Sequence, residues 1–273
     1  RVATTGRPGP VLVDIPKDIQ FAKMSYSKPK VEKKLNGKSL NHFSQKDIDT
    51  LIGLMNKSKK PIIYSGGGVI NSGPEASNVL RELVELTGFP ITSTLQGLGA
   101  YPGDDNQFLG MLGMHGTYEA NNAMHDCDLL INIGARFDDR ITGKIDEFSP
   151  KSKKGHIDID PSSINKIIKV DLALVGDVKE VLKGITKTLK KKNLDLKKSN
   201  KQQIAKWWEQ IQKWRTKNSL HFKNSDETIK PQHAVQRLYE LTKHKDTYVT
   251  TEVGQHQMWA AQHYKFNKPN RWM

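Results

Sequence analysis

The chain has 273 residues, of which 36% are hydrophobic and 26% charged, and its formal net charge is +14 at pH 7. This length suits one large domain or two ordinary ones, and no apolar run approaches the roughly 20 residues that span a bilayer. The positive charge is compatible with nucleic-acid binding, but many lysines gather in residues 179–223, which favours a solvated surface. The single cysteine, Cys127, cannot form an internal disulfide, is typical of a reducing compartment and argues against a cysteine-based metal site.

The first residues indicate the end of one domain and then a linker. A β-branched run at residues 11–15 lies between prolines and predicts a strand. Residues 21–43 show no steady period and have the composition of a linker. Because the chain begins with arginine and ends after a polar, aromatic run, we expect an internal piece of a longer protein; a complete, processed protein is the alternative.

Strands and helices alternate in the middle of the chain. Apolar spacing predicts helices at residues 44–57, 74–87, 117–125 and 178–189. Ser44 is the expected N-cap of the first helix, with Asp47 in a capping-box position. Short apolar runs predict strands at residues 61–64, 89–92, 128–133, 156–160 and 170–175. The alternation predicts an α/β domain with a doubly wound, mostly parallel sheet.

The last part of the chain predicts a second linker and the start of another domain. Residues 190–228 are rich in lysine and carry tryptophans at helical spacing, which favours a helix packed on the protein's own core over a base-stacking surface. Residues 231–242 predict a helix that begins with proline. Residues 247–250 predict a strand.

Glycine or charged residues follow five predicted strands, at the edge where parallel sheets bind ligands. The glycines at residues 66–68 let backbone N–H groups approach a phosphate, although a plain tight turn has the same composition and no GxGxxG pattern is present. Asp158 and Asp160 close a later strand and are typical of ribose contacts. Asp177 follows the last of these strands in the same way.

The stretch at residues 110–140 combines the strongest of these signals. His115 lies in a glycine-flanked loop, where it would contact a phosphate or a flavin ring, or be a plain surface histidine. Arg136 and Arg140 follow the next strand and suit bidentate binding of a pyrophosphate, with surface ion pairs to the neighbouring aspartates as the alternative. Taken together, the strand ends favour a nucleotide-cofactor site.

Several long motifs then occur in one order along the chain: GRPGPVLVDIPKDIQ, TLQGLGAYP, LGMHGT, RFDDR, HIDIDPSSI, VGDVKEVL and VGQHQMWAAQ. They closely resemble the catalytic subunits of the acetolactate synthase (acetohydroxyacid synthase) family, and the likeness covers nearly all of the chain except the lysine-rich linker. The resemblance implies three α/β domains. Residues 1–20 would end the pyrimidine-binding domain, residues 44–189 would form a central FAD-binding domain, and residues 229–273 would open a diphosphate-binding domain.

The resemblance also implies site residues. FAD contacts map onto Arg7, Gly66, Gly67, Gly68, Thr94, Leu95, His115, Gly116, Thr117, Gly134, Ala135, Arg136, Asp138, Arg140, Asp158, Ile159, Asp160 and Asp177. Thiamine-diphosphate contacts map onto Val253, Gly254, Gln255, His256 and Met258. Lys17 falls where the family lines its substrate and inhibitor channel.

The implied activity is thiamine-diphosphate-dependent joining of two 2-oxo acids, with Mg²⁺ and a non-redox FAD as further cofactors. Pyruvate would be decarboxylated and joined to pyruvate or 2-oxobutyrate, in the first common step of branched-chain amino-acid biosynthesis. The family further implies a homodimer or homotetramer, a small regulatory subunit, and a cytoplasmic enzyme in bacteria or an organellar one in eukaryotes. It implies neither a nucleic-acid nor a membrane partner.

Two family features lie outside this sequence. The catalytic glutamate is expected before Arg1, and the GDG…N segment that binds the metal is expected after Met273, so we expect no catalytic residue, no metal ligand and no activity in the chain alone. The alternatives are a related carboligase such as glyoxylate carboligase, a non-enzymatic flavin- or nucleotide-binding module, and a basic nucleic-acid binder.

Overall fold

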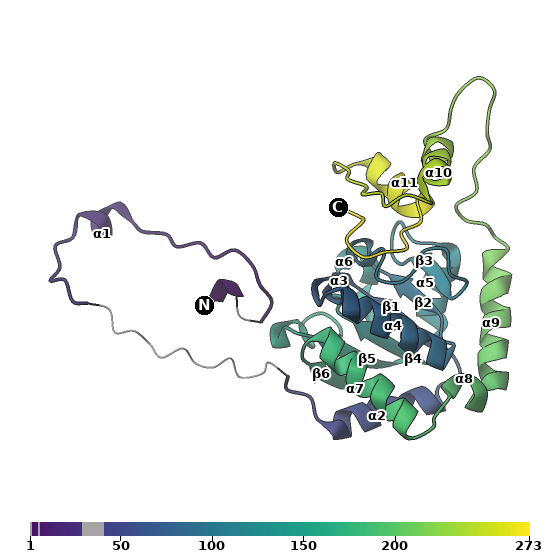
Figure 1. Ribbon diagram of the computed structural model, residues 1–273, viewed down its shortest axis with the longest axis horizontal. Coiled ribbons are helices and arrows are strands. Elements are labelled where there is room, and N and C mark those ends of the chain that lie inside the picture. The colour runs from purple at the N-terminus through teal and green to yellow at the C-terminus, as the bar shows by residue number, and fades with distance from the viewer. Residues whose placement is uncertain (1, 5, 29–40) are drawn as a thin grey trace.

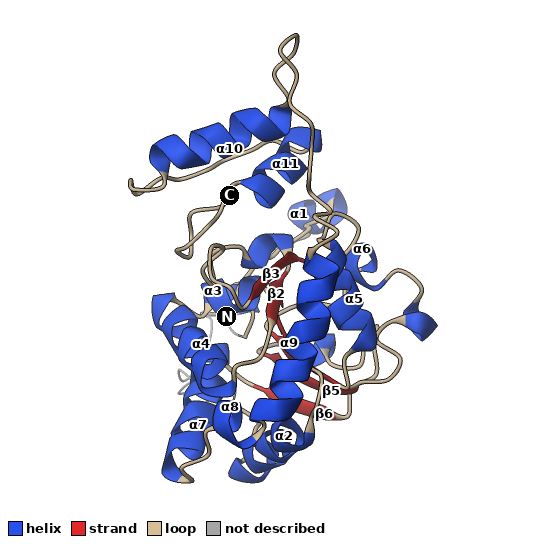
Figure 2. Ribbon diagram, turned by 90° about the vertical axis from the view of Figure 1, so that its right-hand side faces the viewer, coloured by secondary structure: helices blue, strands red, loops and turns tan. Residues whose placement is uncertain are grey.

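A six-stranded, entirely parallel sheet forms the centre of the molecule (Figure 2). The computed structural model describes residues 2–4, 6–28 and 41–273, so most of the predicted first linker lies outside the described residues. The strands are β1 (Pro61–Ser65), β2 (Ile91–Ser93), β3 (Phe108–Met111), β4 (Leu129–Ile133), β5 (Lys153–Asp158) and β6 (Leu172–Val175). They lie in the order β3-β2-β1-β4-β5-β6, which confirms the predicted α/β fold.

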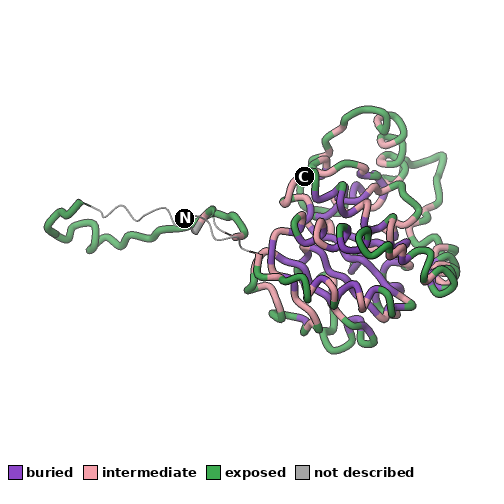
Figure 3. The backbone as a smooth tube through the Cα atoms, turned by 60° about the horizontal axis from the view of Figure 1, so that its bottom comes forward, coloured by how far each residue is buried: buried purple, intermediate pink, exposed green. Residues whose placement is uncertain are grey.

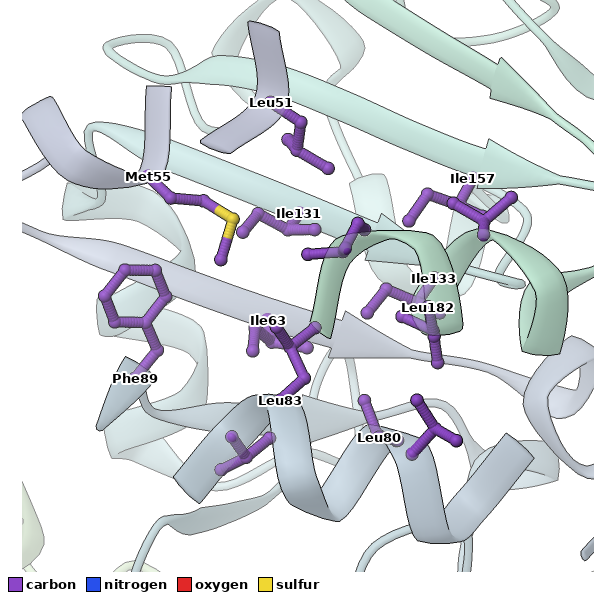
Figure 4. Close-up of a cluster of buried hydrophobic side chains, with 14 of the residues drawn as sticks. Leu51, Met55, Ile63, Leu80, Leu83, Phe89, Ile131, Ile133, Ile157 and Leu182 are labelled. Atoms are coloured by element: carbon purple, nitrogen blue, oxygen red, sulfur yellow. The ribbon is translucent and has the colours of Figure 1, made fainter. Parts of the chain in front are cut away.

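Four helices cover one face of the sheet: α2 (Gln45–Lys57), α4 (Pro74–Thr87), α7 (Val178–Lys191) and α8 (Leu196–Ser199). Their apolar sides meet those of the strands in one buried cluster, part of which Figure 4 shows. Leu51 of α2, Leu83 of α4 and Leu182 of α7 are fully buried there. Each helix shows the apolar spacing of a single buried face, because only that stripe contacts the sheet.

Two helices, α5 (Tyr118–Asp126) and α9 (Lys201–Arg215), cover the opposite face. Trp207 of α9 is buried, and its indole N–H donates to the carbonyl of Pro61 at 2.9 Å. Ile211, one turn further along, is buried beside it. The tryptophan stripe therefore packs on the core, as the sequence predicts, and a part of the lysine-rich segment is helical.

Two further helices, α10 (Pro231–Thr242) and α11 (Gln255–His263), pack on each other near the β3 side of the sheet (Figure 1). Leu98, Met111, Ala260 and Trp272 belong to the cluster that joins them to the sheet domain. The remaining helical segments are short: η1 (Val2–Thr4), α1 (Lys17–Phe21), α3 (Gly67–Asn71), η2 (Leu95–Gly97), α6 (Asp139–Thr142), η3 (Ile145–Glu147) and η4 (Pro161–Ser163).

The ends of α2 and α4 have the residues that helix termini need. The Ser44 side chain accepts from the backbone N–H of Asp47, whose carboxylate accepts from the Ser44 backbone N–H, so the predicted capping box is present. α4 starts at Pro74 and ends before Gly88, whose φ of 70° lies in the left-handed region. The predicted bounds of α4 and α10 are confirmed.

Two strand predictions are wrong or incomplete, and one strand was not predicted. Residues 11–15 form no strand: residues 7–28 are exposed, as Figure 3 shows, and no strand in the described part of the chain pairs with them, so their β propensity has no ladder to join. Residues 247–250 make only one bridge, between Val249 and Trp272. β3 was not predicted, because four residues that include Gly110 carry too little periodicity.

The strand predicted at residues 156–160 is shifted. β5 begins at Lys153 and ends at Asp158. Asp160 lies beyond it and caps η4, where its side chain accepts from the backbone N–H of Ser162. The division of the whole chain into three domains stays a prediction.

Candidate functional site

The carboxyl ends of all six strands lie along one edge of the sheet, because every strand pair is parallel. Along this edge the strand order reverses between β1 and β4, which lie side by side with Ser65 opposite Ile133. Ligands of doubly wound sheets bind at such a point. The segments that leave β1 and β4 are residues 66–68 and 134–140, both predicted from the sequence.

These two segments pack tightly against each other. The backbone N–H of Gly68 donates to the carbonyl of Gly134 at 2.9 Å. A Cβ atom at Gly66 would lie 2.4 Å from the Gly134 oxygen, and one at Gly68 would lie 2.7 Å from the Gly134 Cα. Gly66, Gly68 and Gly134 are thus required by backbone packing at the crossing, whether or not a ligand is present. Gly67 is less confined, since its nearest contact would be 3.3 Å away at Gln96.

The predicted arginines lie on the surface of the 134–140 segment. Arg136 pairs with Asp138 at 3.6 Å and Arg140 with Asp139 at 3.6 Å, and each of these four side chains is at least 43% exposed. Asp138 caps α6, and the backbone N–H of Arg140 is the main reason why the pKa of Asp138 is lowered. The surface ion pairs that were the alternative to pyrophosphate binding are therefore present. They leave both guanidinium groups accessible to an anion.

The His115 loop is attached to the same segment. The backbone N–H of Met114 donates to the carbonyl of Arg140 at 3.0 Å. Asn121 of α5 holds the other side of the loop, accepting from the Gly113 N–H at 2.9 Å and donating to the Gly113 carbonyl at 3.0 Å. His115 and Gly116 are thereby held beside Arg140, and the imidazole is exposed.

Thr94 carries a buried polar atom without a partner. Its Oγ1 has no hydrogen bond within the described chain, although its backbone N–H donates to the carbonyl of Ser65 at 3.0 Å. Buried hydroxyl groups normally find a partner, and this one lies directly after β2, at the edge where the strands end. Leu95 follows at the start of η2, next to this hydroxyl in the chain.

Two other predicted residues use their side chains to cap helices. Thr117 accepts from the backbone N–H of Ala120 at 3.2 Å. Asp177 accepts from the backbone N–H of Lys179 at 3.0 Å and from the Ser72 hydroxyl at 2.7 Å. Both residues lie at the strand-end edge, but their side chains already have structural partners.

The structure brings Arg7 near Asp160, which lies just beyond the end of β5. Asp158 accepts from the backbone N–H of Asp160 at 2.8 Å, with Ile159 between them. Hydrogen bonds from Ser162 are the main cause of the lowered pKa of Asp160, and the nearby charge of Arg7 contributes. Arg7 is therefore the one predicted residue before residue 28 that approaches the sheet edge.

The predicted thiamine-diphosphate segment lies at the start of α11. Val253, Gly254, Gln255 and His256 are exposed, and Met258 is partly so. Farther along α11, the Gln262 amide donates to the carbonyl of His115 at 3.0 Å. The helix of this segment thus contacts the loop of the predicted flavin site.

Lys17 lies apart from the other predicted site residues. It begins α1 on the exposed N-terminal segment, away from the sheet (Figure 1).

Between α5 and α6 lies a pocket of about 240 Å³ lined by Leu112, Asn121, Met124, His125, Ile141, Thr142, Lys144, Glu147, Phe148 and Ser149. It contains none of the predicted site residues.

The described residues contain neither a cluster of metal-ligating side chains nor a membrane-spanning helix. No group of three or more His, Cys, Asp or Glu side chains is placed to hold a metal ion within residues 2–4, 6–28 and 41–273. Over the same residues, no helix has both the length and the apolar character needed to cross a bilayer.

Sequence reasoning missed two buried polar residues beneath this edge, Asn132 and His156. Both make hydrogen bonds to Ala135. The available signal was an asparagine inside the otherwise apolar strand LLINI, because a buried amide needs partners that an ordinary strand does not provide.

Comparison with known proteins places these features in a family. The sequence profile of the thiamine pyrophosphate enzyme central domain matches residues 48–185. The chain is 44% identical over 277 residues to an acetolactate synthase large subunit from Buchnera aphidicola subsp. Schizaphis graminum, covering all of this chain and 46% of that protein.

Two further relatives come from a bacterium and a plant. Acetolactate synthase isozyme 3 large subunit of Escherichia coli is 42% identical over 278 residues, covering all of this chain and 47% of the relative. The chloroplastic acetolactate synthase of Arabidopsis thaliana is 43% identical over 277 residues, covering all of this chain and 40% of the relative. The chain spans about half the length of the curated relatives it matches.

Proposed function

Because the chain belongs to the thiamine pyrophosphate enzymes, whose central domain matches residues 48–185, we propose that it is part of an acetolactate synthase large subunit. Identity of 42% and 44% along the whole chain to such subunits supports this proposal. The activity proposed for the whole protein is decarboxylation of pyruvate and joining of its two-carbon unit to pyruvate or 2-oxobutyrate. The products would be 2-acetolactate or 2-aceto-2-hydroxybutyrate, precursors of the branched-chain amino acids.

The central domain is proposed to hold FAD at its strand-end edge. The observation that carries this proposal is the orphaned Thr94 hydroxyl, which is buried at the end of β2 and lacks a partner in the described chain. Exposed guanidinium groups at Arg136 and Arg140 would neutralise a pyrophosphate at the same edge. The residues present fit an anionic nucleotide, which we propose in a structural rather than redox role.

Thiamine diphosphate, when bound, supplies the carbanion and the electron sink that decarboxylation of a 2-oxo acid requires. The chain's own contribution would be binding and orientation by the exposed residues Val253, Gly254, Gln255, His256 and Met258. The contact between Gln262 and His115 would keep this segment in register with the flavin site. Lys17 is proposed to line the substrate channel.

The remaining partners are proposals for the whole protein. Mg²⁺ would accompany thiamine diphosphate in the whole protein, while the described residues contain no group of three metal-ligating side chains. The words "large subunit" in the names of relatives support a separate small regulatory subunit. A homodimer or homotetramer is proposed, with a cytoplasmic location in bacteria or an organellar one in eukaryotes.

Titration of the chain with FAD tests the flavin proposal. We expect flavin fluorescence to be quenched on binding, and we expect Arg136→Ala with Arg140→Ala to weaken the affinity by tenfold or more, because two charge-assisted contacts are lost. Arg237→Ala is the matched control, since it removes one exposed guanidinium from α10, which carries no predicted flavin residue. Equal affinity of the double variant and the control would contradict the assignment of the arginines.

Product analysis tests the reaction. The full-length protein that contains this chain, supplied with thiamine diphosphate, Mg²⁺ and FAD, is expected to form 2-acetolactate from pyruvate. Glyoxylate in place of pyruvate distinguishes the glyoxylate carboligase alternative, which predicts turnover of glyoxylate instead. A protein that only binds flavin would turn over neither acid.

A further inference from the structure

A row of buried polar side chains crosses the sheet beneath the 134–140 segment. Tyr64 of β1, Asn132 of β4 and His156 of β5 are register partners, so their side chains share one face. Their exposed fractions are 0%, 0% and 1%. Burial of such groups is costly unless they are hydrogen-bonded, and two of the three make hydrogen bonds to a single residue, Ala135.

Ala135 makes three hydrogen bonds with these two side chains, accepting two at its carbonyl and donating one from its N–H. The Asn132 amide donates from Nδ2 to the Ala135 carbonyl at 2.8 Å, and its Oδ1 accepts from the Ala135 N–H at 3.2 Å. His156 Nε2 lies 3.2 Å from the same carbonyl. A carbonyl oxygen only accepts, so Nε2 carries the proton in this contact. The ring of Phe137 packs edge-on against the imidazole at a centroid distance of 5.2 Å, and Nδ1 has no hydrogen-bond partner in the described chain.

The opposite side of the same peptide is held by glycine packing. A Cβ atom at Gly66 would lie 2.6 Å from the Ala135 Cα, and the Gly68 N–H donates to the Gly134 carbonyl. The 134–135 peptide is therefore held from both sides. Arg136 follows it directly, so the direction of its side chain depends on how Ala135 is oriented.

We propose that Asn132 and His156 are positioning residues that fix the Ala135 peptide, so that Arg136 and Arg140 face the strand-end edge before a phosphate-bearing nucleotide arrives. This inference rests on the proposed flavin site and deepens it. The benefit is preorganisation, because a loop already held in its binding conformation loses less entropy when the ligand binds. Neither residue is proposed to touch the nucleotide.

Amide hydrogen exchange of the chain tests the contact without any ligand. The Ala135 N–H is bonded to Asn132, whereas the neighbouring Gly134 N–H is bonded to the carbonyl of Ile157 at 2.8 Å. In Asn132→Ala, we expect the Ala135 amide to exchange about tenfold faster while the Gly134 amide is unchanged. Asn132→Leu, which keeps nearly the same shape without the amide, replaces the alanine variant if that variant does not fold.

Variants of His156 and Tyr64 supply the matched comparison. His156→Leu is expected to weaken FAD binding about tenfold, and His156→Gln is expected to restore most of it, because its amide again places a donor near the Ala135 carbonyl. Tyr64→Phe is the control. The Tyr64 hydroxyl is equally buried in the same row but has no hydrogen-bond partner in the described chain, so its removal should leave both measurements unchanged.

The outcomes separate this inference from the flavin proposal. If the unmodified chain does not bind FAD, the flavin proposal fails, and the positioning role fails with it even where the exchange result stands. If the chain binds FAD, equal affinity in Asn132→Ala overturns the positioning role. Faster exchange at Gly134 and Ala135 alike, or an equal loss of affinity in Tyr64→Phe, also overturns it, because either result indicates general loosening of the sheet.

Discussion

Gly68 lies where the segments leaving β1 and β4 cross, and it has no room for a side chain. A Cβ atom there would lie 2.7 Å and 2.8 Å from the Cα and the oxygen of Gly134. Both atoms belong to the backbone, which cannot move aside as a flexible side chain would. The glycine is therefore needed for the strands to approach each other at the proposed site.

We expect Gly68→Ala to lower the free energy of unfolding by about 1 to 3 kcal/mol, as overpacking of a tight interior does. The control is Gly53→Ala in α2, where a Cβ atom would meet nothing within 4 Å. That substitution should stabilise the chain by about 0.5 to 1 kcal/mol, because alanine favours the helix. Denaturant unfolding measures both, and equal midpoints for the two variants would contradict the packing argument.

At the residue scale, the sequence located the strand-end edge but not the use of each side chain. Glycines and charged residues after apolar runs predicted that residues 66–68 and 134–140 follow strands, and the structure brings the two segments into contact. Thr117 and Asp177 stand at the starts of predicted helices and cap N–H groups within three residues, so these N-caps could have been predicted from the sequence. Asn132 inside an apolar strand signalled a buried amide that needs partners, whereas its bonding to Ala135 depends on the turn that follows β4.

At the scale of elements, α2 shows how local sequence determines a helix start. The Ser44 hydroxyl and backbone N–H both donate to the Asp47 carboxylate, and the hydroxyl also accepts from the Asp47 N–H. The hydrogen bonds from the Ser44 hydroxyl and backbone N–H are the main reasons why the pKa of Asp47 is lowered. All partners lie within four consecutive residues, which explains why the sequence alone predicted this cap.

We expect Ser44→Ala to lower stability by about 1 kcal/mol at pH 7, as the loss of an N-cap does. The pKa of Asp47 is lower in the folded chain, so the stability that it contributes is present above its unfolded pKa of about 3.9 and is lost as pH falls through the lower folded value. The difference in the free energy of unfolding between the unmodified chain and Ser44→Ala should therefore become smaller below about pH 4. Thermal unfolding of both proteins from pH 3 to pH 7 measures this difference. A difference in stability that does not change with pH would contradict the role of Asp47.

At the scale of the whole molecule, the formal net charge is +14, and several of the lysines pair with acidic side chains of neighbouring helices. Lys183 and Lys190 of α7 pair with Glu75 and Glu82 of α4, and Lys192 pairs with Asp49 of α2 at 2.7 Å. These pairs are exposed and add little stability. They place acidic groups beside lysines, which weakens any continuous basic surface.

We therefore expect only weak, non-specific binding to duplex DNA. Affinity detectable at about 50 mM salt should fall steeply and be lost near 200 mM, because only released counterions drive it. Fluorescence anisotropy with a labelled duplex over this salt range is the measurement. Affinity that persists at high salt or depends on base sequence would support the nucleic-acid alternative.

The sequence by itself determined the helices with caps and amphipathic faces, the parallel class of the sheet and the residues that follow its strand ends. These features depend on spacing within a few residues and on the alternation of strands with helices. The tertiary structure decided which apolar runs became strands. Within the described part of the chain, residues 11–15 have no partner strand, whereas Phe108–Met111 does, because β structure exists only where a neighbour completes its hydrogen bonds. It also brought four residues against the peptides of Gly134 and Ala135, namely Gly66, Gly68, Asn132 and His156. These residues lie in or directly after three different strands, so no local sequence pattern predicts that they contact the same peptides.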